Sequence, residues 1–157
     1  MKKLCLVCSP GGHLDEMKEL EGLYRKYDHF FITFRNPHTT NLKKTEKVYF
    51  VTNPQRLQAL YNPFRFIISI VQSFIILLKE KPDFIVSTGA GVAVPVCYAA
   101  KILRKKIVFI ELTSSVTKLG WSGRMIYPIA DLFFVQYKKL AENYKKAIYV
   151  GNLHDFC

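Results

Sequence analysis

The sequence predicts an α/β protein with a single doubly wound, mostly parallel sheet. Two patterns predict it. Short runs of β-branched and aromatic residues alternate with helical stretches along the chain, and these runs are apolar at nearly every position, as in Ile107–Ile110. Strands covered by helices on both faces have this character. The 157 residues, 50% of them apolar, are enough for one core, and no linker or low-complexity tract divides them. We therefore expect residues 1–157 to form one domain.

The expected elements follow from these runs and from the turn residues between them. The predicted strands are Lys3–Cys8, His29–Phe34, Lys47–Val51, Asp83–Ser87, Lys106–Glu111, Asp131–Gln136 and Ala147–Val150. The predicted helices are His13–Tyr27, Pro54–Tyr61, Pro63–Lys81, Val92–Leu103, Ser122–Ala130 and Lys138–Tyr144. In open sheets of this type, ligands bind beyond the carboxyl ends of the strands. Three loops at that edge carry chemistry: 9–13, 87–91 and 111–115.

The charge balance indicates an anionic partner. The 23 Lys and Arg residues outnumber the 12 Asp and Glu residues, for a net charge of +11, which attracts phosphorylated ligands, nucleic acids or anionic membranes. Nucleic acid is disfavoured as a partner, because the basic residues are scattered from Lys2 to Lys146 without a nucleic-acid-binding motif. The apolar stretch Leu4–Cys8 is too short for a signal peptide, and no run reaches the roughly 18 apolar residues of a membrane span.

The four cysteines predict buried free thiols of a cytosolic protein rather than a disulfide framework. Cys5 and Cys8 lie in one apolar run, and the strand period of two sends their side chains to opposite faces of the sheet. The Cys-x-x-Cys spacing is therefore a weak redox signal here.

The first two loops can approach a phosphate closely. Glycines let the backbone turn sharply, and the helix N-terminus behind each loop favours an anion. Together they suit a diphosphate, although similar turns also occur in doubly wound proteins that bind no phosphate. A dinucleotide site is disfavoured, because neither loop has the G-x-G-x-x-G spacing and the second strand ends in Arg35-Asn36 rather than an acidic residue. The candidate diphosphate-binding residues are Ser9, Gly11, Gly12, Ser87, Thr88, Gly89 and Gly91.

His13 and Glu111 are the candidate catalytic residues. His13 lies where the first glycine loop enters a helix, whose dipole favours the neutral imidazole that can accept a proton; the alternative role is capping or packing. Glu111 ends an apolar strand, where its carboxylate would bind a sugar hydroxyl, orient His13, or serve as a helix cap or ion-pair partner. The spacing of the other histidines suggests no metal site. The loop after Glu111 adds candidate acceptor contacts at Thr113, Ser114 and Ser115.

The helix predicted to begin at Pro63 is unusually apolar. From Phe66 to Leu78 the polar residues are Ser69, Gln72 and Ser73, which share one narrow stripe and leave a wide apolar face. With basic flanks, such a helix suits a membrane interface, and the alternative is a helix buried in the core. The residues expected to face the membrane are Phe64, Arg65, Ile68, Ile75 and Lys79.

Four ordered motifs carry a resemblance to a known family: SPGGHL at 9–14, STGAGVAVP at 87–95, FIELTSS at 109–115 and YVGN at 149–152. The chain resembles the membrane-associated, acceptor-binding subunit of split GT-B glycosyltransferases. These include bacterial capsular and exopolysaccharide biosynthesis proteins and a eukaryotic subunit acting in dolichol-linked N-acetylglucosamine transfer. The chain is also similar to the N-terminal half of the lipid II-forming N-acetylglucosaminyltransferase, whose Gly-Gly-His loop matches Gly11, Gly12 and His13. The resemblance implies a Rossmann-like fold.

The resemblance also implies one half of an inverting hexosyl or N-acetylhexosaminyl transferase. This half would bind a polyprenyl-diphosphate-linked sugar acceptor as a peripheral protein at the cytoplasmic face of the membrane. A separate small subunit would bind the UDP-sugar donor, so no cofactor is expected on this chain, which would be inactive alone. The chain ends shortly after Gly151-Asn152, where a one-chain enzyme would continue into a donor domain. The resemblance gives the eukaryotic subunit an N-terminal membrane anchor, whereas we expect residues 3–8 to form a strand and membrane attachment to fall to the 63–79 helix and the basic surface. The alternative function is a self-sufficient small enzyme acting on a phosphorylated metabolite.

Overall fold

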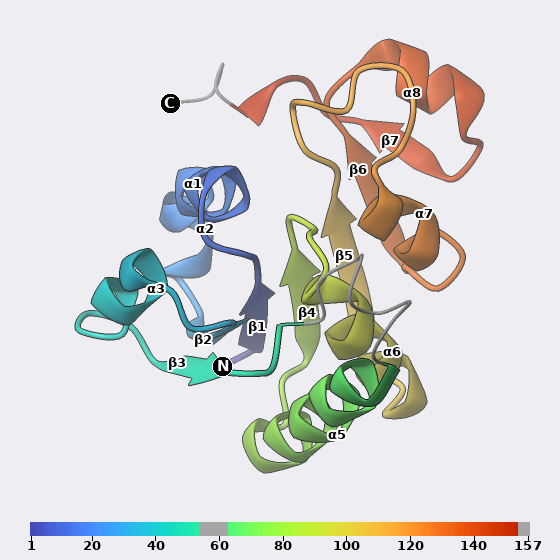
Figure 1. Ribbon diagram of the computed structural model, residues 1–157. Helices are drawn as coiled ribbons and strands as arrows, with labels where there is room; N and C mark the ends of the chain where they lie inside the picture. The colour runs from blue at the N-terminus through green and yellow to red at the C-terminus, as the bar shows by residue number, and fades with distance from the viewer. Residues whose placement is uncertain (54–62, 154–157) are drawn as a thin grey trace.

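The computed structural model describes residues 1–53 and 63–153, and it contains a seven-stranded, fully parallel sheet (Figure 1). The strand order is β3-β2-β1-β4-β5-β6-β7. This arrangement confirms the predicted doubly wound sheet, and each predicted strand is present with its ends shifted by at most one residue. The strands are β1 Lys3–Val7, β2 Asp28–Thr33, β3 Val48–Phe50, β4 Phe84–Ser87, β5 Lys106–Ile110, β6 Leu132–Val135 and β7 Ala147–Tyr149.

Helices connect most of the strands. The helices with described bounds are α1 Gly12–Glu19, α2 Glu21–Tyr24, α3 Pro37–Leu42, α5 Pro63–Glu80, α6 Ala93–Ile102, α7 Trp121–Ile126 and α8 Lys138–Asn143. Two predictions were wrong. The single helix expected at His13–Tyr27 is interrupted at Leu20. Helix α3, capped by the Asn36 side chain and started by Pro37, lies in a stretch for which we predicted neither a helix nor a strand. The helix predicted at 54–61 lies outside the described residues.

The core has two parts, one on each face of the sheet. Helices α5, α6 and α7 pack on one face against residues such as Cys5 and Phe109, while α1 and α2 cover the other face at residues such as Leu6 and Cys8. The two cysteines therefore point to opposite faces, as the strand period predicts. Cys5, Cys8 and Cys97 are all buried free thiols.

One part of the sheet is less well covered. On the face that carries α1 and α2, the strand residues Phe84, Val86, Val108, Ile110 and Phe134 line an apolar groove of about 590 Å³. Leu20, Leu23 and Tyr27 form one wall of this groove, and Val150 and Leu153 form part of the other. We call it the open groove. Parallel sheets are normally covered on both faces, so this groove is an unusual amount of apolar surface to leave in water.

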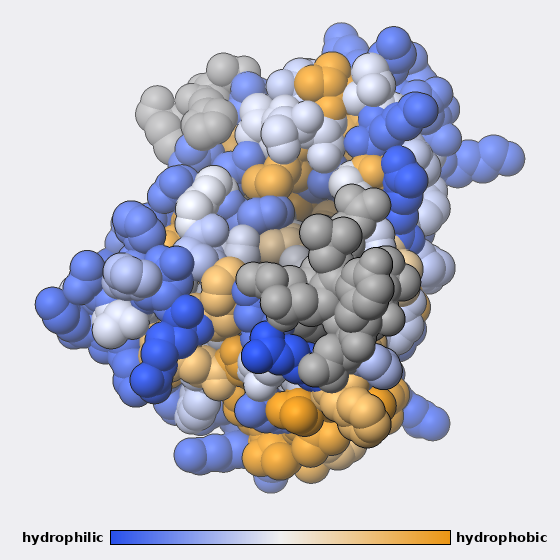
Figure 2. Space-filling view, in the orientation of Figure 1, coloured by the Kyte–Doolittle hydropathy of each residue, from blue (hydrophilic) through white to orange (hydrophobic). Residues whose placement is uncertain are grey.

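Helix α5 packs against α6 with its polar stripe turned inward. Ser69 and Ser73 are fully buried, and the Ser73 hydroxyl donates to the Ser69 carbonyl at 2.6 Å. The apolar residues of the opposite side face outward, and Figure 2 shows the resulting hydrophobic surface over α5. Of the two alternatives for this helix, complete burial in the core is therefore wrong. The exposed apolar residues of α5 are Phe64, Ile67, Ile68, Val71, Ile75 and Leu78.

No helix within residues 1–53 or 63–153 has the length and apolar character needed to cross a bilayer. Helix α5, with 18 residues, ends in a polar cluster at the amino-terminal edge of the sheet. There the buried Glu80 carboxylate accepts hydrogen bonds from Lys3 Nζ at 2.6 Å, from Lys47 Nζ at 2.9 Å and from the Tyr49 hydroxyl. Burial alone would raise the pKa of Glu80, but these three donors outweigh it and lower the pKa to about 2. This cluster fixes the C-terminal end of α5 to strands β1 and β3.

Candidate functional site

The candidate site lies at the point where the strand order reverses. Strands β2 and β3 extend the sheet from one side of β1, and β4 to β7 extend it from the other. The loops after β1 and β4 therefore flank a crevice at the carboxyl edge, the usual ligand position in such sheets. A pocket of about 310 Å³ opens there, which we call the His13 pocket. It is lined by His13, Asn53, Ala90, Gly91, Glu111, Leu112, Ser114, Ser115, Gly120, Trp121 and Ser122.

Two hydrogen bonds join His13 to the β4 loop across this crevice. The Thr88 carbonyl lies 2.8 Å from Nδ1 of His13, and the Thr88 hydroxyl donates to the His13 carbonyl at 2.7 Å. Because a carbonyl oxygen can only accept, Nδ1 carries the proton and Nε2 of the neutral ring keeps its lone pair. Burial lowers the pKa of His13, and the Thr88 carbonyl only partly opposes this effect. The imidazole is therefore neutral at physiological pH and able to accept a proton.

Glycine is required at two positions of these loops. Gly11 precedes α1 with φ 88°, and Gly89 has φ 103°, both in the region that side chains disfavour. A Cβ added at Gly89 would lie 3.3 Å from both the His13 ring and the Ser122 hydroxyl. Gly89 thus brings the β4 loop directly against the imidazole. Around Gly11 and Gly12, by contrast, an added Cβ would meet nothing within 4 Å, so this loop backbone is open to a ligand.

Glu111 is buried beside the pocket and only half satisfied. One carboxylate oxygen accepts a hydrogen bond from the Ser115 hydroxyl at 2.9 Å, whereas Oε2 has no hydrogen-bond partner among the described residues. Oε2 lies so close to α7 that a Cβ at Gly123 would be 2.0 Å from it. Burial raises the pKa of Glu111, and the Ser115 hydroxyl together with the backbone N–H groups of Leu112 and Gly120 partly opposes the shift. A desolvated carboxylate of this kind is typical of functional sites, although it can also be structural.

A second buried carboxylate ties α1 to the ends of β5 and β6. Glu16 of α1 accepts hydrogen bonds from the Thr113 backbone N–H at 2.9 Å, from the Thr113 hydroxyl, and from Nε2 of Gln136 at 2.8 Å. The same Gln136 nitrogen donates to the Glu111 carbonyl at 3.0 Å. Glu16 lies one turn after His13, so this network fixes the helix that carries His13 relative to the strand that carries Glu111.

The structure places the predicted site residues in three groups. His13, Gly91, Glu111, Ser114 and Ser115 meet in the His13 pocket. Gly11 and Gly12 are not among the lining residues of this pocket and lie on the loop that leads into His13. The third group faces the interior of the protein. The Ser87 hydroxyl donates to the Val7 carbonyl and accepts from the Gly89 N–H. Ser9 and Thr88 are buried. Thr113 binds Glu16. The residues of this last group shape the loops through internal hydrogen bonds.

Sequence reasoning missed several residues of the site. Asn53, Trp121 and Ser122 line the pocket, yet the predicted helix began only at Ser122 and the residues before it were not considered. The only tryptophan of the chain, one residue after Gly120 in the sequence GWSG, was an available signal. No spacing rule pointed to Glu16 or Gln136, which are far apart in sequence and meet only in the folded chain.

Solved structures share this fold. MurG from Acinetobacter baumannii superposes with a TM-score of 0.73 over 88% of this chain and 43% of that chain, at 15% identity. A UDP-N-acetylglucosamine 2-epimerase from Rickettsia bellii superposes with a TM-score of 0.75 over 99% of this chain and 46% of that chain, at 13% identity. The fold defines the class: a Rossmann-like domain that matches the N-terminal half of GT-B enzymes.

Sequence comparison identifies the family within this class. The profile described as "Oligosaccharide biosynthesis protein Alg14 like" matches residues 4–153, and the chain belongs to that family. The human UDP-N-acetylglucosamine transferase subunit ALG14 is 36% identical over 87 residues, which are 52% of this chain and 40% of that protein. The subunit of the same name from Yarrowia lipolytica is 40% identical over 81 residues, 48% of this chain and 38% of that protein. The matches thus span about two fifths of these relatives.

Proposed function

We propose that this chain is the acceptor-binding subunit of a two-component glycosyltransferase whose donor is a UDP-sugar. By analogy with its relatives, that donor is UDP-N-acetylglucosamine. The acceptor is a sugar linked to a polyprenyl diphosphate, in the biosynthesis of a polysaccharide or a lipid-linked oligosaccharide. One observation carries the proposal. His13 holds a neutral imidazole with Nε2 as its acceptor atom, in a pocket between two glycine loops. A base beside an open diphosphate-binding loop is what transfer to such an acceptor requires.

In this proposal the chain supplies the base and the acceptor contacts. The N–H groups of the open Gly11-Gly12 loop and the N-terminus of the eight-residue helix α1 bind the acceptor diphosphate. The acceptor hydroxyl oxygen forms a bond to the anomeric carbon of the donor sugar and gives its proton to His13 Nε2. The bond between that carbon and the UDP oxygen breaks. Glu111 and the hydroxyls of Ser114 and Ser115 bind the acceptor sugar.

The donor subunit is the proposed partner. Its binding is supported by the open groove, whose apolar strand residues would be covered in a complex.

Membrane association is supported by α5. Phe64 is 72% exposed, Ile75 is 60% exposed, and Arg65 and Lys79 flank the apolar side of the helix. We propose that this side lies in the interface at the cytoplasmic face, where the positive net charge adds attraction to anionic lipids.

A transfer assay tests the core of the proposal. The chain is assayed with native lipid-linked acceptors and UDP-N-acetylglucosamine, with and without a co-expressed donor subunit. We expect transfer only when both proteins are present. Robust transfer by this chain alone would reject the two-component scheme. Turnover of a small phosphorylated metabolite by the isolated chain would favour the alternative of a self-sufficient enzyme.

A vesicle-binding assay tests the membrane proposal separately. The double variant Ile68→Asp/Ile75→Asp should no longer sediment with anionic vesicles, while its thermal unfolding stays cooperative, because both side chains are already exposed. Val116→Asp, at a site 47% exposed in a loop, is the matched control and should still bind. Salt should weaken the wild-type binding without abolishing it, since screening acts only on the charge contribution. Wild-type-like binding of the double variant would place the membrane surface elsewhere.

A further inference from the structure

Trp121, the only tryptophan of the sequence, lines the His13 pocket. It is the first residue of helix α7 and directly follows the N-cap, Gly120. The proposed reaction assigns it no role. A tryptophan ring supplies a large flat apolar surface whose face carries a partial negative charge. Such a ring among polar lining residues indicates a ligand that has an apolar face of its own.

The residues around Trp121 hold it in place. Gly120 lies against Glu111, since a Cβ added at Gly120 would be 3.2 Å from Oε1 of that carboxylate. The Tyr98 hydroxyl donates to the Met125 carbonyl at 3.1 Å, which ties α7 to α6. Trp121 itself is half-buried and packs against the hydrophobic core. Its ring is therefore a fixed wall of the pocket and not a free surface side chain.

The other lining residues supply hydrogen-bonding groups of several kinds. They include an imidazole, an amide, two hydroxyls and a carboxylate, from His13, Asn53, Ser114, Ser122 and Glu111. Donors and acceptors are thus mixed around one aromatic ring. A sugar ring presents the matching combination, with hydroxyls at its rim and C–H bonds on its faces.

The charge and the size of the pocket narrow the choice of sugar. Among the described residues that line it there is no Lys or Arg, whereas Glu111 contributes a carboxylate. A phosphate or a uronic acid would therefore meet a like charge without a cation to offset it. The volume of about 310 Å³ is at the lower end of the range for ligand pockets. These properties fit a single neutral sugar, with the diphosphate outside the pocket at the glycine loop.

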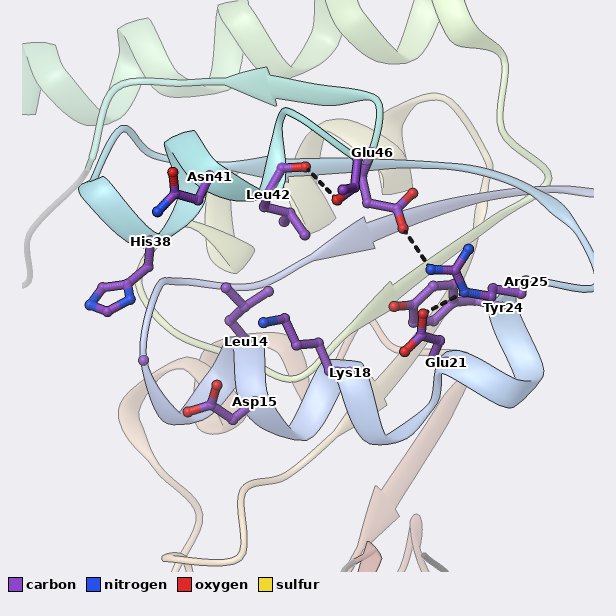
Figure 3. A pocket seen from close by; sticks show the side chains of 12 residues that line it. Leu14, Asp15, Lys18, Glu21, Tyr24, Arg25, His38, Asn41, Leu42 and Glu46 are labelled. Atoms are coloured by element: carbon purple, nitrogen blue, oxygen red, sulfur yellow. Dashed lines mark hydrogen bonds and ion pairs between the residues drawn. The ribbon is translucent and has the colours of Figure 1, made fainter.

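The larger pocket on the other side of that loop offers no comparable surface. It lies between α1, α2 and α3 and has a volume of about 590 Å³ (Figure 3). Its Arg25 pairs with Glu21 and Glu46, and Lys18 is exposed to solvent. Tyr24 also lines it but is only 3% exposed, so its ring presents little area to a ligand. The sugar is therefore better placed in the His13 pocket, against Trp121.

We propose that Trp121 is the stacking platform for the acceptor sugar and that it selects a neutral pyranose. The inference rests on the proposed function, because it concerns the acceptor of that reaction. The C–H bonds on one face of the pyranose pack on the indole ring, whose negative face attracts them. The hydroxyls at the rim bind Asn53 and Glu111, and one of them meets Nε2 of His13. Stacking fixes the plane of the sugar and thereby the hydroxyl that is presented to the base.

The fluorescence of Trp121 tests the proposal directly, because no other tryptophan contributes to the signal. The full chain is titrated with short-chain, water-soluble isoprenyl diphosphates that carry glucose, galactose, N-acetylglucosamine, glucuronic acid or no sugar, and separately with UDP. We expect at least one probe with a neutral sugar to change the emission saturably, whereas the sugar-free probe, the glucuronic acid probe and UDP leave it unchanged. The proposal is overturned if no neutral sugar changes the emission, or if the sugar-free probe, the glucuronic acid probe or UDP changes it as strongly.

Two variants separate stacking from a structural role. Trp121→Leu removes the aromatic face, and Trp121→Phe keeps a smaller one; binding to both is measured by NMR amide shifts. Trp121→Leu should weaken binding of the neutral-sugar probe roughly twofold to tenfold, the usual contribution of an aromatic contact, and Trp121→Phe should recover part of this loss. The sugar-free probe should bind all three proteins equally. Met125→Ala, in the same helix but not lining the pocket, is the matched control and should bind as the wild type does.

The outcomes distinguish the platform from the proposed function. Wild-type affinity of Trp121→Leu for the neutral-sugar probe would show that Trp121 only packs against the core, and would overturn the platform even if the two-protein transfer assay succeeds. Equal weakening of the sugar-free and neutral-sugar probes would indicate a distorted glycine loop and likewise overturn it. A sugar-dependent change in Trp121 emission together with failed transfer would support the platform and count against the proposed reaction alone.

Discussion

Glu80 and Glu111 are both buried carboxylates, at opposite edges of the same sheet, and their environments differ in kind. Glu80, at the amino edge, accepts three hydrogen bonds, two of them from lysines, and its pKa falls to about 2. Glu111, at the carboxyl edge, has the Ser115 hydroxyl and the Leu112 and Gly120 backbone N–H groups beside it but no cation, its Oε2 has no hydrogen-bond partner among the described residues, and its pKa is raised. Burial acts on both in the same direction, so the donors decide the outcome. A satisfied carboxylate stabilises the fold, whereas an unsatisfied one retains capacity to bind or react.

The largest expected effect is on the rate of transfer and concerns His13, at the carboxyl edge of the sheet. In the complex with its donor subunit, His13→Ala should lower the rate of transfer by roughly 10²- to 10⁴-fold, the usual contribution of a positioned base. Binding to the partner and to vesicles should persist, since the loss is confined to the chemical step. Because the pKa of His13 is lowered from 6.5, the acidic limb of the wild-type pH–rate profile should lie below pH 6.5.

His13→Asn provides the control for that prediction. The structure gives α1 no side-chain cap, since its N-cap is Gly11, so the structural role to test is the hydrogen bond from His13 to the Thr88 carbonyl. The asparagine amide can donate to a carbonyl but cannot accept the proton. Full activity of His13→Asn at saturating acceptor would show that His13 has only a structural role, and the Gly11-Gly12 loop would then act as a diphosphate-binding loop alone.

The next effect is on stability and concerns Glu80, at the amino edge of the sheet. Glu80→Gln should lower the free energy of unfolding at pH 7 by about 1.5–3 kcal/mol, the range for a hydrogen bond to a charged group. A carboxyl with a lowered pKa stabilises the fold above its ordinary pKa of 4.5, and this contribution is lost as the pH falls toward about 2. Chemical denaturation of both proteins from pH 7 to pH 2 should therefore show the difference shrinking below pH 4.5. A difference that is constant over this range would contradict our account of Glu80.

A glycine tests how tightly Glu111 is enclosed. Gly123→Ala places a Cβ 2.0 Å from Oε2 of Glu111, so α7 or the carboxylate must move, and we expect a loss of about 1–3 kcal/mol in the free energy of unfolding. The same substitution in a Glu111→Ala background should cost less, because the clash is removed. Gly22→Ala in α2 has open space around the new Cβ and should be neutral or stabilising. Equal costs in both backgrounds would contradict this packing.

The smallest effect concerns Glu111, whose contribution to the free energy of unfolding should change with pH in the opposite direction to that of Glu80. A carboxyl with a raised pKa binds its proton more tightly in the folded state, so its contribution to stability falls as the pH rises above its ordinary value of 4.5. The free energy of unfolding of Glu111→Gln, relative to the wild type, should therefore shift in favour of the variant between pH 4 and pH 7. The size of the change follows the size of the pKa shift, and its sign is what the measurement decides. A shift in favour of the wild type would show that Glu111 is a satisfied structural carboxylate like Glu80.

Much of the architecture could be predicted from the sequence because it depends on local patterns. Continuous apolar runs predicted all seven strands, and the period of two placed Cys5 and Cys8 on opposite faces. The Gly11-Gly12-His13 loop was singled out because paired glycines between a strand and a helix let backbone N–H groups approach a phosphate, and its ligand stays a prediction. Helix α3 was missed because its six residues are too few to show a helical period, although Asn36-Pro37 is a start signal.

Only the tertiary structure decided how these pieces act together. The sequence shows that α5 has a serine stripe and a wide apolar face, but not which side turns inward; packing against α6 buries the serines and exposes the isoleucines. It shows two glycine loops, but not that β1 and β4 are neighbours, which is what joins His13 to Thr88. Nor does it show that Glu16 binds Thr113 and Gln136, or that Gly123 encloses Glu111. Local composition determines elements, whereas the pairing of distant residues depends on strand order and on which faces the whole chain must bury.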